Sequence, residues 1–147
     1  IFEEEMLLGL KALPGSYEIL SFCRERRIKA AVLTNKYGPH ARVACEYLRF
    51  SKLLSFTLGA DDTEWKKPDP RLTRHALEKL DRNPNETLYL GDSPYDYETA
   101  TQAELKPILV STGTHSREEL EAIAPDCVHS NLDEVTKKVL PALIQRD

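Results

Sequence analysis

The sequence has few cysteines and no long apolar run, and these two shortages exclude whole classes of protein. Cys23, Cys45 and Cys127 are odd in number and widely spaced, and no Cys-x-x-Cys pair occurs. They fit reduced thiols of a cytoplasmic protein better than a disulfide framework or a zinc site. No apolar run approaches the ~20 residues that a membrane-spanning helix needs, so we expect no membrane partner.

The sequence also lacks an excess of positive charge. The 147 residues carry 20 Lys and Arg against 24 Asp and Glu, and the formal net charge is −4. This balance argues against a nucleic-acid-binding surface. The basic run from Arg24 to Lys29 ends a predicted helix over 15–26, where cations interact favourably with the helix dipole and need no partner. The four histidines are dispersed and lack metal-ligand spacing.

Short apolar runs alternate with amphipathic segments, and this alternation is typical of α/β proteins. The pattern predicts strands at 28–33, 55–58, 87–90, 107–111 and 127–129. It predicts helices at 1–12, 15–26, 39–49, 70–80, 95–104, 116–123 and 131–145. We therefore expect a three-layer sandwich around a mostly parallel, Rossmann-like sheet.

Several residues mark helix ends. Asp69 followed by Pro70 predicts an N-cap and a first helical residue. Ser116 with Glu119, and Ser130 with Asp133, match capping boxes for the last two helices. Pro141 should kink or shorten the final helix, because proline cannot donate the backbone hydrogen bond that a helix interior requires.

The most informative motif is Gly91-Asp92-Ser93-Pro94-Tyr95-Asp96, which follows the apolar run at 87–90. It places two carboxylates four residues apart where a strand ends and a helix begins. The carboxyl edge of the strands is where open α/β sheets bind ligands. Carboxylates with water and substrate phosphate are the usual ligands of Mg²⁺. The alternative interpretation is a plain strand-to-helix turn, since Asp and Ser also cap helices.

Two upstream motifs favour the functional interpretation. Thr34 and Asn35 follow the strand at 28–33, where hydroxyl, amide and backbone N–H groups can hold phosphoryl oxygens. Lys67 directly precedes the helix that starts at Pro70, so its ammonium could neutralise a phosphate or a carboxylate. Taken singly, the first pair could merely start a helix and the lysine could be a solvated surface residue. Three such motifs in order make coincidence a poor explanation.

The ordered set resembles motifs II, III and IV of the haloacid dehalogenase superfamily, most closely its phosphoglycolate-phosphatase-like branch. The residues are Thr34-Asn35, then Lys67-Pro68-Asp69-Pro70, then Gly91-Asp92-Ser93 with Asp96. The resemblance extends from Leu13 to Leu143, and the set is specific where each motif alone is not. One departure is Glu104, where a glycine commonly follows the motif IV helix.

A larger departure is the absence of the family's motif I, an Asp-x-Asp pair whose first Asp is the nucleophile. No Asp-x-Asp occurs in the sequence. We therefore interpret residues 1–12 as the returning end of a helical cap or its hinge, and residues 13–147 as a core domain without its first strand. In the family that strand lies between the strands ending at Thr34 and Gly91. A preceding segment, a partner chain or Ile1–Leu10 refolded as a strand should then fill this place.

The resemblance implies an Mg²⁺-dependent hydrolase of a small phosphorylated metabolite, acting through an aspartyl-phosphate whose Asp this chain lacks. Lys67 and Thr34 would be catalytic, and both would contact the phosphoryl group together with Asn35. Asp92 would bind the metal, with Asp96 doing so directly or through water. Ser93 is a weaker candidate for a place near the substrate. This chain alone should be inactive.

Alternatives remain for the function and for single residues. The family also contains phosphomutases and dehalogenases, although a dehalogenase would leave the paired acids of motif IV unexplained. A catalytically inactive scaffold is the non-enzymatic alternative. Trp65 and Tyr95 could line a substrate mouth or simply pack against neighbours. Asp61 and Asp62 fit turn residues better than ligands.

Overall fold

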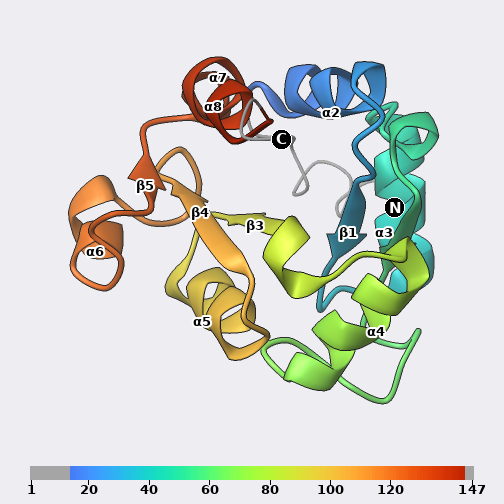
Figure 1. The fold of residues 1–147 in the computed structure, drawn as a ribbon. Coiled ribbons are helices and arrows are strands. Elements are labelled where there is room, and N and C mark those ends of the chain that lie inside the picture. Colours follow the sequence, from blue (N-terminus) through green and yellow to red (C-terminus); the bar gives the residue numbers. More distant parts are fainter. Residues whose placement is uncertain (1–13, 145–147) are drawn as a thin grey trace.

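The computed structural model describes residues 14–144, and within them all strand pairs are parallel. The strands are β1 (Ala31–Leu33), β2 (Phe56–Leu58), β3 (Leu88–Gly91), β4 (Lys106–Val110) and β5 (Val128–His129). They form one sheet of order β1-β2 and another of order β3-β4-β5. Parallel neighbours need long crossover connections, which here contain helices. The predicted α/β class with a parallel sheet is confirmed (Figure 1).

The helices alternate with these strands. They are α2 (Ser16–Glu25), α3 (Gly38–Tyr47), α4 (Pro70–Leu80), α5 (Pro94–Gln102), α6 (Arg117–Glu121), α7 (Leu132–Glu134) and α8 (Leu140–Ile144). Short 3₁₀ turns cover Ser51–Leu53 and Pro84–Glu86, and a π-helical turn covers Val135–Val139. None of the helices within residues 14–144 has the length and apolar character needed to cross a bilayer.

Most predicted element positions agree with the structure, with differences at the ends. The first predicted strand is shorter than 28–33, since Ile28 closes the turn after α2 by donating to the Cys23 carbonyl at 2.8 Å. The helix predicted at 1–12 lies outside the described residues. The irregularity expected near Pro141 takes the form of the π-helical turn that precedes it.

Two of the three predicted helix starts are confirmed and one is corrected. Asp69 accepts the Arg71 N–H at 2.9 Å, and Ser116 forms a capping box with Glu119. The capping box predicted for Ser130 and Asp133 is wrong by one position. Asn131 is the N-cap and accepts the Glu134 N–H at 2.8 Å. Asn has a side-chain carbonyl at the position where the backbone is extended, so it competes successfully with the preceding Ser.

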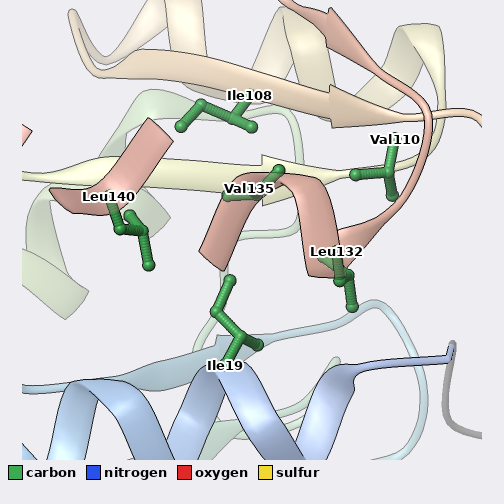
Figure 2. Packing of buried hydrophobic residues seen from close by; sticks show 6 residues of the cluster. All are labelled: Ile19, Ile108, Val110, Leu132, Val135 and Leu140. Carbon is green, nitrogen blue, oxygen red and sulfur yellow. The ribbon is translucent and has the colours of Figure 1, made fainter. Parts of the chain in front are cut away.

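Strand β4 packs against buried apolar residues on both of its faces. Ile108 and Val110 point to one side and pack against Ile19 of α2 and the C-terminal helices (Figure 2). Leu109 points to the other side and packs against Leu120 of α6. Side chains alternate across a strand, so consecutive apolar residues require cover on both faces. This arrangement produces layers of helix above and below the sheet.

Helix α4 connects the two sheets. Leu72 and Ala76 pack against Leu58 of β2, whereas Leu77 packs against Ala100 of α5. The apolar stripe of an amphipathic helix is wide enough to serve both neighbours. The loop that leads into α4 is therefore held between the ends of β1 and β3.

The family topology expected from the sequence has one strand between β1 and β3. The two strands do not pair directly, because they belong to separate sheets within residues 14–144. Direct pairing would have contradicted the expected order. The stretch Ile1–Leu10, one of the segments proposed to fill this place, lies outside the described residues. The filling segment therefore stays a prediction.

Candidate functional site

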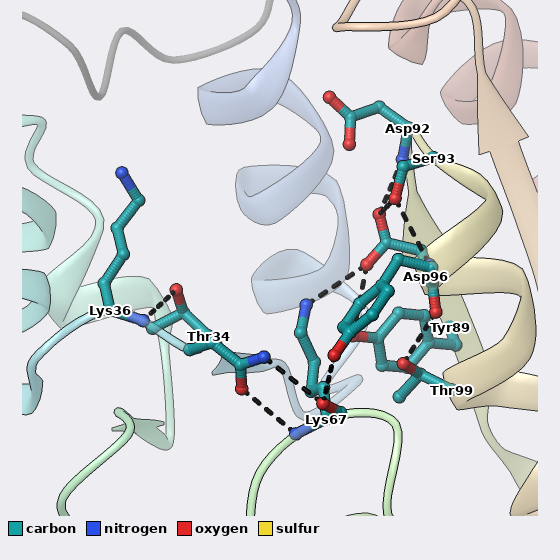
Figure 3. Close-up of polar contacts among 10 residues, drawn as sticks. Thr34, Lys36, Lys67, Tyr89, Asp92, Ser93, Asp96 and Thr99 are labelled. Atoms are coloured by element: carbon teal, nitrogen blue, oxygen red, sulfur yellow. Dashed lines mark hydrogen bonds and ion pairs between the residues drawn. The ribbon is translucent and has the colours of Figure 1, made fainter.

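The three sequence motifs meet at the carboxyl ends of β1 and β3. Thr34 follows the last residue of β1, and Asp92 follows the last residue of β3. Lys67 lies in the loop before α4 and extends its side chain toward the first turn of α5 (Figure 3). Parallel strands present their carboxyl ends at one edge, so residues far apart in sequence come together there.

Lys67 and Asp96 form the central ion pair of this site. The Lys67 Nζ lies 3.2 Å from the Asp96 Oδ1, and the two side chains are 14% and 11% exposed. The other carboxylate oxygen accepts the Asp92 N–H and the Ser93 hydroxyl, each at 3.0 Å. Asp96 is therefore held by a cation and by two uncharged donors, as a buried carboxylate requires.

The half-buried Tyr89 belongs to the same cluster. Its hydroxyl lies 3.5 Å from the Asp96 Oδ1, and the Lys67 Nζ lies 5.8 Å from its ring centroid. Sequence reasoning missed this residue, since a tyrosine in an apolar run looks like an ordinary strand residue. No local signal distinguishes a tyrosine whose hydroxyl reaches a carboxylate from one that only packs.

These contacts keep the pair charged. Burial lowers the pKa of Lys67, but Tyr89 and Asp96 outweigh it, so the pKa lies above its ordinary value. Burial raises the pKa of Asp96, yet the Lys67 ammonium and the hydrogen bonds from Asp92 and Ser93 hold it below its ordinary value. Both partners are thus ionised near neutral pH.

Asp92 is oriented differently from Asp96. Its carboxylate points away from Lys67 (Figure 3). Its Oδ2 accepts the Thr114 N–H at 3.4 Å. Burial, followed by the nearby Asp96 carboxylate, raises the pKa of Asp92. A Cβ on Gly113 would lie 1.9 Å from the same oxygen, so only glycine leaves room for the side chain there. Among residues 14–144, the Asp92 carboxylate accepts one backbone hydrogen bond through Oδ2, whereas both oxygens of Asp96 are engaged.

Gly91 permits the close approach of α5 to β3. A Cβ at this position would lie 2.2 Å from the Asp96 Cβ and 2.3 Å from its Cγ. Backbone and Asp96 side chain thus occupy the space that any larger residue would need. The glycine of the Gly-Asp-Ser motif is explained by this contact.

The backbone of Lys67 is also held. Its N–H donates to the Asn35 Oδ1 at 3.0 Å, and its carbonyl accepts from the Asn35 Nδ2 at 3.3 Å. The Tyr95 hydroxyl donates to the same carbonyl at 2.7 Å. Sequence reasoning placed Asn35 at the phosphate, whereas in the structure its amide contacts the Lys67 peptide.

The remaining predicted residues lie around this cluster. Thr34 is half-buried, and its hydroxyl accepts the Lys36 N–H at 3.1 Å. Ser93 caps α5 by accepting the Asp96 N–H. Trp65 contacts the Leu58–Leu72–Ala76 cluster, and its ring lies edge-on to His75 at 6.2 Å between centroids. This favours the packing role over the substrate mouth for Trp65.

Asp61 and Asp62 act as turn residues, as the sequence predicts. Asp61 accepts the Gly38 N–H at 2.6 Å, and Asp62 accepts the Gly59 N–H at 2.6 Å. Asp62 also pairs with Arg42 at 2.8 Å. These bonds join the loop after β2 to the start of α3.

The described part of the chain does not form a complete metal site by itself. Within residues 14–144, no group of three or more His, Cys, Asp or Glu side chains is arranged to hold a metal ion. Asp92 provides one half-buried carboxylate, which is the donor type that Mg²⁺ prefers.

Comparisons with known proteins agree with this geometry. Residues 1–110 match the family model described as haloacid dehalogenase-like hydrolase. The chain is 31% identical to a phosphoglycolate phosphatase of Rhodospirillum rubrum over 83% of its length and 50% of that protein's. It is 29% identical to pyrophosphatase PpaX of Bacillus mycoides, over 81% of this chain and 55% of the relative.

A solved structure shares the fold. It is a haloacid dehalogenase-superfamily hydrolase from Ehrlichia chaffeensis, with a TM-score of 0.74 at 22% identity, and the match covers 89% of this chain and 58% of that one. The chain thus spans about half the length of the curated relatives it matches.

Proposed function

The chain belongs to the haloacid dehalogenase-like hydrolases, and from this premise we propose that it forms the domain that binds the phosphoryl group in an Mg²⁺-dependent phosphomonoester hydrolase. The substrate would be a small phosphorylated metabolite. The nucleophilic aspartate, which would form an aspartyl-phosphate, would lie outside these 147 residues. A cytoplasmic location is part of the same proposal and is supported by three free thiols.

One observation carries the proposal. A lysine with a 14% exposed side chain is held charged beside Asp96 at the meeting point of three motifs. Burying an ion pair is costly, and an apolar pair would often serve stability equally well. A positive charge at the carboxyl edge of the strands has a direct use, because phosphoryl transfer is catalysed mainly by positioning and by electrostatic stabilisation.

Each residue of this chain has a proposed task. The Lys67 ammonium would stabilise negative charge on the phosphoryl oxygens, and Asp96 would hold that ammonium in place. The Thr34 hydroxyl would donate a hydrogen bond to the phosphoryl group. Asp92 would provide a carboxylate ligand for Mg²⁺, which would neutralise phosphate charge when bound. The occupied carboxylate of Asp96 supports contact with the metal through water rather than directly.

Metal binding tests the role of Asp92. Calorimetric titration with Mg²⁺ should use the protein with its natural upstream sequence, and Asp92→Asn should reduce the affinity far more than Asp61→Asn. Asp61 is a matched control because it is also a loop aspartate after a strand, although it lies three positions beyond the end of β2 rather than one. Equal effects of the two substitutions would overturn the assignment.

A measurement of phosphatase turnover distinguishes an enzyme from a catalytically inactive scaffold. This chain alone should not hydrolyse p-nitrophenyl phosphate in the presence of Mg²⁺, because it has no Asp-x-Asp. The protein with its natural upstream sequence should hydrolyse it, and Lys67→Ala should abolish that activity. If the natural upstream sequence contains no Asp-x-Asp and the longer protein shows no turnover, the scaffold is favoured. Turnover by this chain alone that Lys67→Ala abolishes would show that the nucleophile is misassigned.

A further inference from the structure

The peptide of Lys67 is the point where three segments of the chain meet. Its carbonyl accepts hydrogen bonds from the Tyr95 hydroxyl at 2.7 Å and from the Asn35 amide at 3.3 Å. Its N–H donates to the Asn35 Oδ1 at 3.0 Å. The donors come from the end of β1 and from the first turn of α5, so both sheets hold one residue of the connecting loop.

The start of α5 contacts both ends of Lys67. Tyr95 binds its carbonyl, and the next residue, Asp96, binds its ammonium at 3.2 Å. Tyr95 itself is anchored, because the fully buried Thr99 donates to the Tyr95 carbonyl at 2.8 Å. Figure 3 shows Lys67 reaching from its loop to Asp96, with Thr99 on the same helix as Asp96. One rigid helix turn thus fixes the main chain and the charged tip of the same lysine.

We propose that Tyr95, assisted by Asn35, is a positioning residue that sets where the Lys67 ammonium stands at the strand ends. This proposal rests on the proposed function, in which that ammonium meets a phosphoryl group. A lysine side chain has a long flexible stem, so its tip is accurately placed only when the backbone is held as well. Small misplacements of a charge-stabilising group reduce phosphate stabilisation strongly.

The position of Tyr95 argues for this role over general stabilisation. The residue is 47% exposed, so its hydrogen bond competes with water and adds little to the free energy of folding. Its hydroxyl is directed at the Lys67 carbonyl. The alternative is that the Tyr95 hydroxyl acts on substrate directly, in which case the Lys67 ammonium would keep its position when the hydroxyl is removed.

The experiment compares Tyr95→Phe with Tyr47→Phe. Tyr47 is 68% exposed on α3 and serves as the matched control. The ammonium resonance of Lys67 is followed by NMR at one pH, and inorganic phosphate is then added as the probe. Tyr95→Phe should shift the Lys67 resonance and weaken phosphate binding by about 2- to 10-fold, the range expected for one lost hydrogen bond. Tyr47→Phe should change neither quantity.

A double-mutant cycle with Asn35→Ala strengthens the test. Both donors bind one carbonyl oxygen, so their effects on the Lys67 resonance should not add. An unchanged Lys67 resonance in Tyr95→Phe, or strict additivity with Asn35→Ala, would overturn the positioning role. Wild-type protein that binds no phosphate while Tyr95→Phe still shifts the resonance would instead overturn the proposed function and leave the positioning of Lys67 intact.

Discussion

Lys67 and Asp96 are 29 residues apart in the sequence, yet their charged groups lie 3.2 Å apart with most of both side chains buried. The lysine enters from the loop before α4, and the aspartate lies in the first turn of α5. Because a buried charge that loses its partner is expensive, this pair couples the site to the stability of the fold.

We expect Lys67→Met to lower the free energy of unfolding by about 3 kcal/mol, because it leaves the Asp96 carboxylate buried without its cation. Chemical denaturation measures the change. Lys137→Met is the matched control, since Lys137 lies 3.1 Å from Asp133 but both side chains are more than 60% exposed. That change should cost less than about 1 kcal/mol. Equal losses in the two variants would show that water screens the Lys67 pair as well.

Gly91→Ala should be destabilising even though it adds only one methyl group. The new Cβ would lie 2.2 Å from the Asp96 Cβ, so the backbone of α5 or β3 must move. Overpacking of this kind costs about 1–3 kcal/mol, and the shift should also lengthen the Lys67–Asp96 contact. Thermal denaturation and the Lys67 ammonium resonance report the two effects. An unchanged melting temperature would mean that the approach of α5 to β3 is looser than the structure indicates.

Thr73→Val should stabilise the protein by about 1 kcal/mol. Thr73 is 2% exposed, and within residues 14–144 its hydroxyl has no hydrogen-bond partner. Valine keeps the shape and removes the unpaired polar atom. Thr99→Val is the control, because the Thr99 hydroxyl is equally buried but donates to the Tyr95 carbonyl at 2.8 Å. If Thr99→Val stabilised the protein and Thr73→Val did not, the hydrogen bonding described for the two threonine hydroxyls would be wrong.

Glu104→Gly should also stabilise the fold. Glu104 follows the C-cap of α5 with φ 64°, a left-handed conformation that costs a non-glycine residue about 1 kcal/mol. The resemblance to the family implies a glycine here, so the departure noted in the sequence corresponds to backbone strain. Glu98→Gly, inside the same helix, should destabilise by about 1 kcal/mol. The opposite signs of the two substitutions, measured by urea denaturation, form the test.

Asp62 should contribute to stability in a pH-dependent way. The hydrogen bond from Arg42 and then that from the Gly59 N–H lower the pKa of Asp62 below its ordinary value. The unfolded chain then binds more protons in the acid range, so the contribution is complete above about pH 4 and is lost as pH falls through the folded pKa.

The matching variant is Asp62→Asn, studied by unfolding at several pH values. It should be less stable than the wild type near neutral pH, and the gap should narrow as the solution becomes more acidic. A gap that stays constant across the acid range would show that the carboxylate charge adds nothing to the contact with Arg42.

Local chemistry explains why much of the fold was predictable. The Asp69 N-cap and the Ser116 capping box are short-range patterns, in which each residue's partner lies within a few positions. The apolar run of β4 predicts a buried strand without naming its partners, which come from distant parts of the chain. The helix start near Ser130 was misplaced because two neighbouring residues can both cap, and only the backbone angles select Asn131.

The sequence by itself determined the family, the α/β alternation and the order of the three motifs, since these depend on residue type and spacing along the chain. Only the tertiary structure decided which contacts the side chains of these motifs make. Asp92 and Asp96 look alike in sequence, but the packing of α5 on β3 directs one toward the Thr114 N–H and the other onto Lys67. Asn35 and Tyr95 reach the Lys67 carbonyl because α4 packs against both β2 and α5, and contacts across about 30 residues depend on such packing.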